Sequence, residues 1–250
     1  MKTQLEQSVG IAHVGRCEAC PHAADVLPAQ KCKPGDKCVK AHSGRQIDRF
    51  FRTNPELAEG YLHDEFWERR AIAVGYAPQE TIGELAQDPD EVVRRAVAMR
   101  LPPDALDAMR KDPDREVRIA VAQRMVPDRL EKMINDPDYM VRMVVARRIP
   151  HGKLPRLATD DDCEVRKIVA EQLPTFFLSK LINDPDAEVR RVVASRALPE
   201  DAARLLGDPD WTVRFAAVGQ VSREAAHRLL DDPEHDVRRA AWQRIEGGGE

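Results

Sequence analysis

The sequence predicts an all-α solenoid of stacked repeats, preceded by a small cysteine-rich domain. Two observations indicate this fold class. The triplet Asp-Pro-Asp, or a close variant, returns every 24 residues from position 88 onward, and four cysteines lie within 22 residues near the N-terminus. A fixed period of this length is the signature of a repeat architecture, in which each unit packs only against its neighbours.

The triplets keep one register, and each precedes a helical pattern. They occupy 88–90, 112–114, 136–138, 160–162 (Asp-Asp-Asp), 184–186, 208–210 and 232–234 (Asp-Pro-Glu), and an arginine stands six residues after each first Asp. Apolar residues such as Val93, Ala96, Val97 and Leu101 recur in every repeat with spacing i, i+3, i+4, i+8. This spacing places them on one helix face. Each repeat is therefore predicted to begin with an α-helix of about eleven residues.

The triplet itself contains start signals for this helix. Asp is a preferred N-cap residue, and Pro suits the first helical position because its missing N–H has no partner there. We expect the first Asp to cap the helix, Pro to follow as the first helical residue, and the second Asp to add favourable negative charge. Each cap is worth on the order of 1 kcal/mol.

A second, much shorter element should follow in each repeat. Prolines such as Pro102 and Pro150 end the first helix, and a short apolar set such as Leu106 and Met109 follows. About seven residues remain for this element, which favours a 3-10 over an α-helix. No segment alternates with period two, so no sheet is expected.

The register defines two domains. The array is expected to begin near Asp64, after a half repeat that contains Pro55, Tyr61 and Leu62. We therefore assign residues 1–62 to the cysteine-rich domain and 63–250 to about eight 24-residue repeats. The last repeat is truncated after Ile245, and residues 247–249 are expected to fray.

The recurring arginine has two interpretations. It could form a basic ladder for an acidic partner, or it could make a structural contact within or between repeats, such as a helical pair of Arg94 with Asp90. Residues that recur in every repeat usually belong to the scaffold. The structural interpretation is therefore favoured.

Cys17, Cys20, Cys32 and Cys38 predict a metal site with the spacing C-x2-C-x11-C-x5-C. Close cysteines in a reducing compartment more often hold metal than form disulfides. Structural zinc favours two compact pairs, and only the first pair here is compact. A [4Fe-4S] cluster spreads its four thiolates over four irons and tolerates uneven spacing. Spacing alone favours [4Fe-4S] and leaves one structural zinc as the alternative.

Other residues near the cysteines have weaker signals. Four lysines interleave with the second pair and could offset the negative charge of a cluster or only keep the domain soluble; they are Lys31, Lys33, Lys37 and Lys40. His13, His22 and His42 are expected to lie at the surface or around the ligands, because four cysteines already complete a site. Cys163 occupies a variable repeat position and is expected to be a free thiol.

Taken together, the 24-residue Asp-Pro-Asp-x-x-Val-Arg-x-x-Val-Ala pattern and the cysteine segment resemble the leucine-rich repeat variant proteins and the iron–sulfur domain at their front. The resemblance covers nearly the whole chain. It implies a right-handed superhelix of alternating α and 3-10 helices without strands, and a [4Fe-4S] cluster on the four N-terminal cysteines. The family's molecular role is not well defined, so the resemblance implies fold and cofactor but little function.

Composition and the absence of known motifs argue against several classes of function. The chain carries 39 basic and 43 acidic residues, a net charge of −4, which argues against nucleic-acid binding driven by phosphate contacts. No stretch is apolar enough for a membrane span and no signal sequence is evident, so a cytoplasmic location is expected. No phosphate-binding loop, H-E-x-x-H or G-x-S-x-G motif occurs, so we expect no enzyme. The favoured function is a protein-interaction scaffold that could respond to redox state or oxygen; electron transfer and a zinc-stapled binding module are the alternatives.

Overall fold

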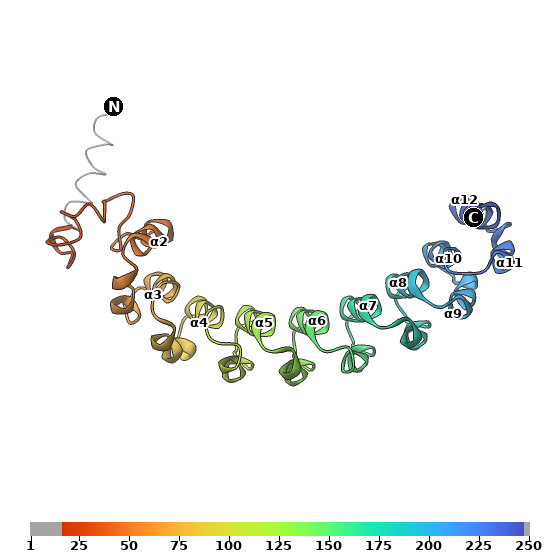
Figure 1. Cartoon of the computed structure of the whole chain (residues 1–250), viewed down its shortest axis with the longest axis horizontal. Coiled ribbons are helices and arrows are strands. Elements are labelled where there is room, and N and C mark those ends of the chain that lie inside the picture. Colours follow the sequence, from red (N-terminus) through yellow and green to blue (C-terminus); the bar gives the residue numbers. More distant parts are fainter. Residues whose placement is uncertain (1–16, 248–250) are drawn as a thin grey trace, which may run out of the picture. The chain divides into compact units, whose positions relative to one another are not determined.

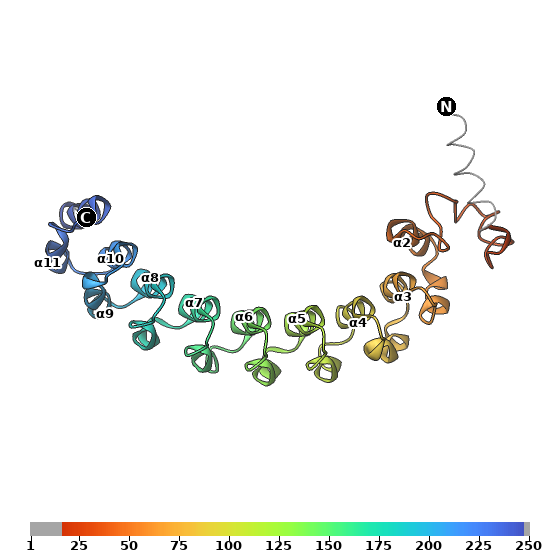
Figure 2. The ribbon, with the colours of Figure 1, turned by 180° about the vertical axis from the view of Figure 1, so that it is seen from behind.

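The computed structural model describes residues 17–247, which form two compact units that divide after Met125. Within each unit the first helices form one row and the short second elements, most of them 3-10 helices, form a second row beside it (Figures 1 and 2). Residues 17–247 contain no strand, and their one β-type pairing is the isolated bridge between Lys33 and Lys37. The prediction of an all-α repeat fold is confirmed. His13 and residues 248–249 lie outside the described part.

Between residues 44 and 125 the first unit contains four α-helices and the 3-10 helices between them. They are α2 (Gly44–Thr53), η1 (Pro55–Leu57), η2 (Glu59–Tyr61), α3 (Trp67–Val74), η3 (Gln79–Thr81), η4 (Gly83–Gln87), α4 (Glu91–Ala98), η5 (Ala105–Met109) and α5 (Arg115–Arg124). Within this unit α2 packs against α3, α3 against α4, and α4 against α5. No helix in the described residues is both long and apolar enough to cross a membrane.

The second unit continues the alternation. It contains η6 (Pro127–Met133), α6 (Tyr139–Arg148), η7 (Leu154–Leu157), α7 (Cys163–Gln172), η8 (Thr175–Leu181), α8 (Ala187–Arg196), α9 (Pro199–Arg204), η9 (Leu205–Gly207), α10 (Trp211–Val218), α11 (Arg223–Ala226), η10 (His227–Leu229) and α12 (His235–Glu246). Here the second element is 3-10 at η6, η7 and η8, as predicted. In the next two repeats it begins instead as a short α-helix, α9 or α11.

The core consists of buried apolar residues from both the first helix and the second element of each repeat. The second-element position is fully buried in every repeat, at Ala58, Ile82, Leu106, Leu130, Leu154, Leu178, Ala202 and Ala226. The two most C-terminal of these residues are alanines, and they lie in the repeats whose second element begins as an α-helix. Ala58 occupies the same position between two 3-10 helices, so alanine there does not by itself select an α-helix.

The prediction for the helix start was wrong by two residues. From α4 to α10 the N-cap is the Asp at the third position of the triplet, as at Asp90, Asp114 and Asp138, and its carboxylate accepts from backbone N–H groups of the first turn; Glu234 before α12 makes no such bond. Proline therefore lies one residue before the cap rather than inside the helix. The helices are consequently shorter than predicted, eight residues in α4 and ten in α5.

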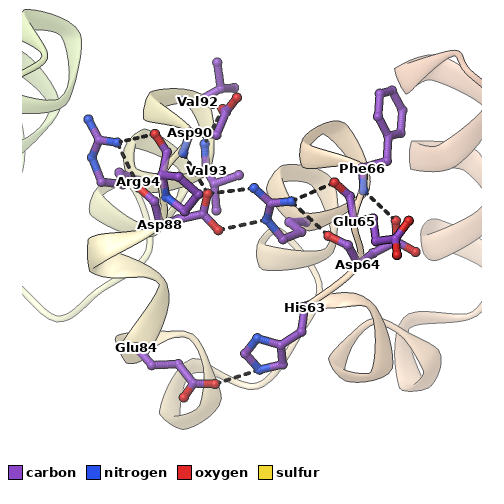
Figure 3. A network of polar contacts seen from close by, with 12 residues as sticks. His63, Asp64, Glu65, Phe66, Glu84, Asp88, Asp90, Val92, Val93 and Arg94 are labelled. Carbon is purple, nitrogen blue, oxygen red and sulfur yellow. Dashed lines mark hydrogen bonds and ion pairs between the residues drawn. The ribbon is translucent and has the colours of Figure 1, made fainter.

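The first Asp of the triplet has a different role, because it binds the arginine of the preceding repeat. Arg94 donates from Nε and Nη2 to Asp112 Oδ2 and Oδ1 at 2.8 and 2.9 Å, while its Nη1 donates to the carbonyl of Asp88 at 2.8 Å. Figure 3 shows Arg94 against Asp88, with Asp90 at the start of α4. The same two-bond pairing recurs in both units, at Arg70–Asp88, Arg142–Asp160, Arg166–Asp184, Arg190–Asp208 and Arg214–Asp232.

These pairs confirm the structural interpretation of the recurring arginine but assign it a different partner. Arg94 bonds Asp112 of the next repeat and not Asp90 of its own helix. In the six pairs above, the Asp side chains are 3–5 % exposed and the Arg side chains 10–14 % exposed. A buried, two-bond pair of this kind fixes the geometry of neighbouring repeats.

A second arginine series, not anticipated from the sequence, caps helix C-termini. Arg100 Nη1 donates to the carbonyls of Val74 and Ala77, and Arg124 Nη1 donates to those of Ala98 and Leu101 at 2.7 and 2.8 Å. Each arginine thus satisfies carbonyls that the preceding helix leaves unpaired. The signal was present in the sequence, since Arg100, Arg124, Arg148 and Arg196 also keep the 24-residue register.

Candidate metal centre

The cysteine-rich segment precedes α2, and α2 is a repeat helix in register. Helix α2 begins 23 residues before α3 and packs against it, and η1 and η2 follow α2 as the second element. The predicted half repeat is therefore a whole α/3-10 repeat. Gln46 stands where later repeats have the recurring arginine, so no Arg–Asp pair of that series joins this repeat to the next. Arg69 binds Asp64 instead, at 2.8 Å.

The first cysteine pair lies in a tight turn. The N–H of Cys20 donates to the carbonyl of Cys17 at 3.1 Å, and the N–H of Ala23 donates to that of Cys20 at 3.1 Å. These successive turns keep the backbone of Cys17 and Cys20 close together.

The second pair is brought together by a five-residue turn. Lys33 N–H donates to Lys37 O at 2.8 Å, and Lys37 N–H donates back to Lys33 O at 3.0 Å. Gly35, at the tip, has a φ of +83°, a conformation that favours glycine. Because this bridge closes the loop, Cys32 and Cys38 stand at its base despite the wider spacing.

All four cysteines line one cavity. Its other walls include His22, Leu27, Val39 and Phe50, together with Lys37 and Lys40. Within residues 17–247 no three Cys, His, Asp or Glu side chains converge as closely as a single metal ion requires. The four predicted cysteines thus share one cavity.

Three contacts to the first helices anchor this segment. The N–H of Cys38 donates to the carbonyl of Gln46 at 3.1 Å, Asn54 Nδ2 donates to the carbonyl of Lys31 at 3.1 Å, and Arg69 Nε donates to the carbonyl of Val39 at 2.7 Å. Each contact holds the backbone at or next to a cysteine. Asn54 and Arg69 were missed from the sequence. Asn54 occupies the repeat position at which the next two repeats have Pro78 and Pro102. The asparagine in place of proline was the available sequence signal.

An aromatic wall closes the cavity on the side of the helices. His22 packs against Phe50 with ring centroids 5.5 Å apart, and its Nε2 lies 2.8 Å from the hydroxyl of Tyr61. Burial raises the pKa of Tyr61 well above its ordinary value, and proximity to Cys20 adds to the effect, so the phenol stays neutral. His22 thus lies around the ligands, as predicted, and His42 instead packs against Phe66.

The thiols influence one another's ionisation. Burial raises the pKa of Cys17 and of Cys32, and the neighbouring cysteines raise both further; Lys37 opposes the shift at Cys32. The thiols of Cys17 and Cys32 therefore favour the protonated form, and metal binding must release these protons. Cys163 is a separate, partly buried free cysteine at the start of α7.

Comparison with known proteins agrees with this architecture. Residues 13–60 match the family model described as LRV protein FeS4 cluster. An uncharacterized 27.7 kDa protein in the nifB 3′ region of Rhodobacter capsulatus is 38 % identical over 86 residues, which cover 34 % of this chain and 35 % of that protein. The chain thus matches about a third of that relative's length.

A solved structure agrees with this chain over nearly its whole length. It is described as a leucine-rich repeat variant with a novel repetitive protein structural motif. It is 54 % identical, with a TM-score of 0.87, and the match covers 91 % of this chain and 97 % of that one. This chain belongs to the leucine-rich repeat variant family.

Proposed function

We propose that this iron–sulfur repeat protein holds one [4Fe-4S] cluster on Cys17, Cys20, Cys32 and Cys38, and that it serves as a scaffold for a protein partner. The observation that carries the proposal is the single cavity lined by all four cysteines. A cubane cluster has one thiolate on each of four irons, so its ligands surround a volume. One zinc would need four sulfurs about 2.3 Å from one point. When bound, the cluster supplies one-electron chemistry.

The surroundings of the cavity suit such a group. The apolar side chains of Leu27, Val39 and Phe50 exclude water, and Lys37 and Lys40 place positive charge beside four thiolates. Surrounding charge and hydrogen bonds tune the reduction potential of a cluster. With a thiolate available for each iron, no iron is left open for a substrate, which supports a non-enzymatic role.

The scaffold part of the proposal rests on the exposed face of the repeat helices. Residues that directly follow the N-cap differ from repeat to repeat, and Tyr139 and Trp211 among them are each 41 % exposed in the second unit. Trp211 also pairs with Phe215, which is 44 % exposed. Aromatic side chains of this kind are enriched in protein interfaces.

Metal analysis of protein purified without oxygen tests the cofactor. The expected result is a coloured protein with about four irons per chain whose visible absorption bleaches on reduction with dithionite. A colourless protein with one zinc per chain would show that the cysteines bind a structural zinc ion and not an iron–sulfur cluster. The Cys163→Ser variant should keep the full iron content, whereas Cys32→Ser should lose most of it.

Affinity capture with reduced and with oxidised protein tests the scaffold. A partner retained by the wild-type chain should be lost by the Trp211→Ser/Phe215→Ser variant. The same partner bound equally in both redox states would eliminate redox response while leaving the scaffold in place. Electron transfer is the second candidate, favoured by the lysines beside the cavity, and a reduction potential outside the range of cellular carriers would exclude it.

A further inference from the structure

Three lysines of the cysteine-rich segment lack an acidic partner within the described residues. Lys31 lies 3.8 Å from Glu56, and Asp36 pairs with Arg49. Neither carboxylate is therefore paired with Lys33, Lys37 or Lys40, and no other ion pair within residues 17–247 involves these three residues. Lys37 and Lys40 line the cavity of the four cysteines, and Lys33 is exposed next to Cys32; we call these three residues the lysine rim.

The backbone gathers this charge in one place. Lys33 and Lys37 face each other in the bridge that closes the five-residue turn. Directly opposed residues of an antiparallel bridge point to the same face, and like charges in that arrangement are destabilising. Lys37 and Lys40 also line the cavity of the four cysteines. The turn thus maintains an unfavourable concentration of positive charge beside the cysteines.

The need to offset the negative charge of a bound cluster explains only part of the positive charge of the lysine rim. Lys37 and Lys40 reach the cavity, but Lys33 is exposed and does not line it. The acidic side chains of Glu56 and Glu59 line the neighbouring hollow next to Lys40, so the positive surface extends from Lys40 toward the turn and not beyond it. Lys33 therefore directs positive charge outward, to solvent or to a partner.

We infer that the lysine rim docks an acidic one-electron carrier protein over the cluster. This inference rests on the proposed cluster. One electron would pass from the reduced carrier to the cluster, leaving the carrier oxidised, with no bond made or broken and no proton required. Complementary charge steers such encounters and raises their association rates.

A protein partner fits the rim better than a nucleic acid does. Residues 17–49 contain no Phe, Tyr or Trp, and the nearest aromatic in the sequence, Phe50, is buried. Single-stranded nucleic acids are usually bound by stacking bases on exposed aromatic side chains along a basic groove. The rim supplies charge without such a stacking surface.

The test uses the full chain loaded with its cluster and a plant-type [2Fe-2S] ferredoxin as the acidic carrier. The Lys33→Gln/Lys37→Gln variant should bind the oxidised ferredoxin about tenfold more weakly than wild type, with a weaker dependence on ionic strength. Its rate of reduction by reduced ferredoxin should fall by a similar factor. Reduction by reduced methyl viologen, a small cation, should not slow in the single Lys33→Gln variant, because Lys33 does not line the cavity, and this separates docking from a change in the cluster itself.

The matched control is Lys111→Gln/Lys180→Gln, which removes the same charge from exposed positions outside the cysteine-rich segment. It should bind ferredoxin like wild type. Equal binding by wild type and the rim variant, with iron content unchanged, would overturn the docking surface while leaving the cluster intact. A wild-type chain without iron would overturn both proposals. Displacement of ferredoxin by single-stranded DNA at physiological salt would show that the lysine rim binds a nucleic acid and would overturn the proposal of a protein partner.

Discussion

The buried pair of Arg166 and Asp184 offers the sharpest test of how neighbouring repeats are held together. Arg166 donates to both carboxylate oxygens of Asp184, at 2.7 and 2.9 Å, and the side chains are 10 % and 3 % exposed. Substituting Asp184→Asn removes the charge that offsets the guanidinium and sets an amide N–H₂ against an N–H donor. Breaking a buried pair costs about 3–5 kcal/mol.

We expect a loss near the lower end, about 3 kcal/mol, because Arg166 keeps its bond to the carbonyl of Asp160 at 2.8 Å. Urea unfolding measures the total effect, and native-state hydrogen exchange measures it by region, since a solenoid need not unfold in one step. The protection of α7 and α8 should fall most. These helices pack directly against each other.

Two further variants separate the ion pair from other effects. The exposed Asp231→Asn should change the free energy of unfolding by less than about 0.5 kcal/mol. Replacing both partners, Arg166→Met/Asp184→Leu, should cost less than the sum of the single losses, because neither charge is left buried alone. An Asp184→Asn loss no larger than that of Asp231→Asn would refute the conclusion that these pairs hold the repeats together.

Three other predictions concern acid stability, helix capping and the glycine of the cysteine turn. The hydrogen bond from Arg214 lowers the pKa of Asp232. The stabilisation that this carboxylate contributes is therefore complete above the ordinary Asp pKa of 3.8 and is lost as the pH falls below that value. Unfolding free energies that stay level down to about pH 2 would contradict this. Asp186→Ala should cost about 1 kcal/mol by removing an N-cap bond, whereas Glu234→Ala, at the same position of a later repeat, should cost almost nothing because Glu234 makes no such bond; thermal unfolding compares them. Gly35→Ala, at a φ of +83°, should destabilise the turn by about 1–2 kcal/mol and lower the iron retained per chain, and Gly83→Ala, at an open position with an ordinary φ, should not.

The sequence was sufficient for the fold class because the repeat information is local and is copied many times. A 24-residue period with apolar residues on one helix face has few physical solutions other than stacked helices. The short second element was likewise predictable from the residues left between two linkers. The four candidate ligands could also be named in advance, since clustered cysteines are recognisable without coordinates. Their identity as ligands and the domain boundary at 62 stay predictions.

The tertiary structure decided the roles of residues that look equivalent in sequence. Both aspartates of each triplet are good capping residues, but only the second caps the helix. The first Asp instead accepts hydrogen bonds from an arginine 18 residues earlier, and this contact forms only when two repeats stack against each other. In the same way, the C-x5-C spacing could not show that a bridge between Lys33 and Lys37 closes the loop beneath a shared cavity. Local preference selects which residues can fill a position, and contacts between distant segments determine which of them does.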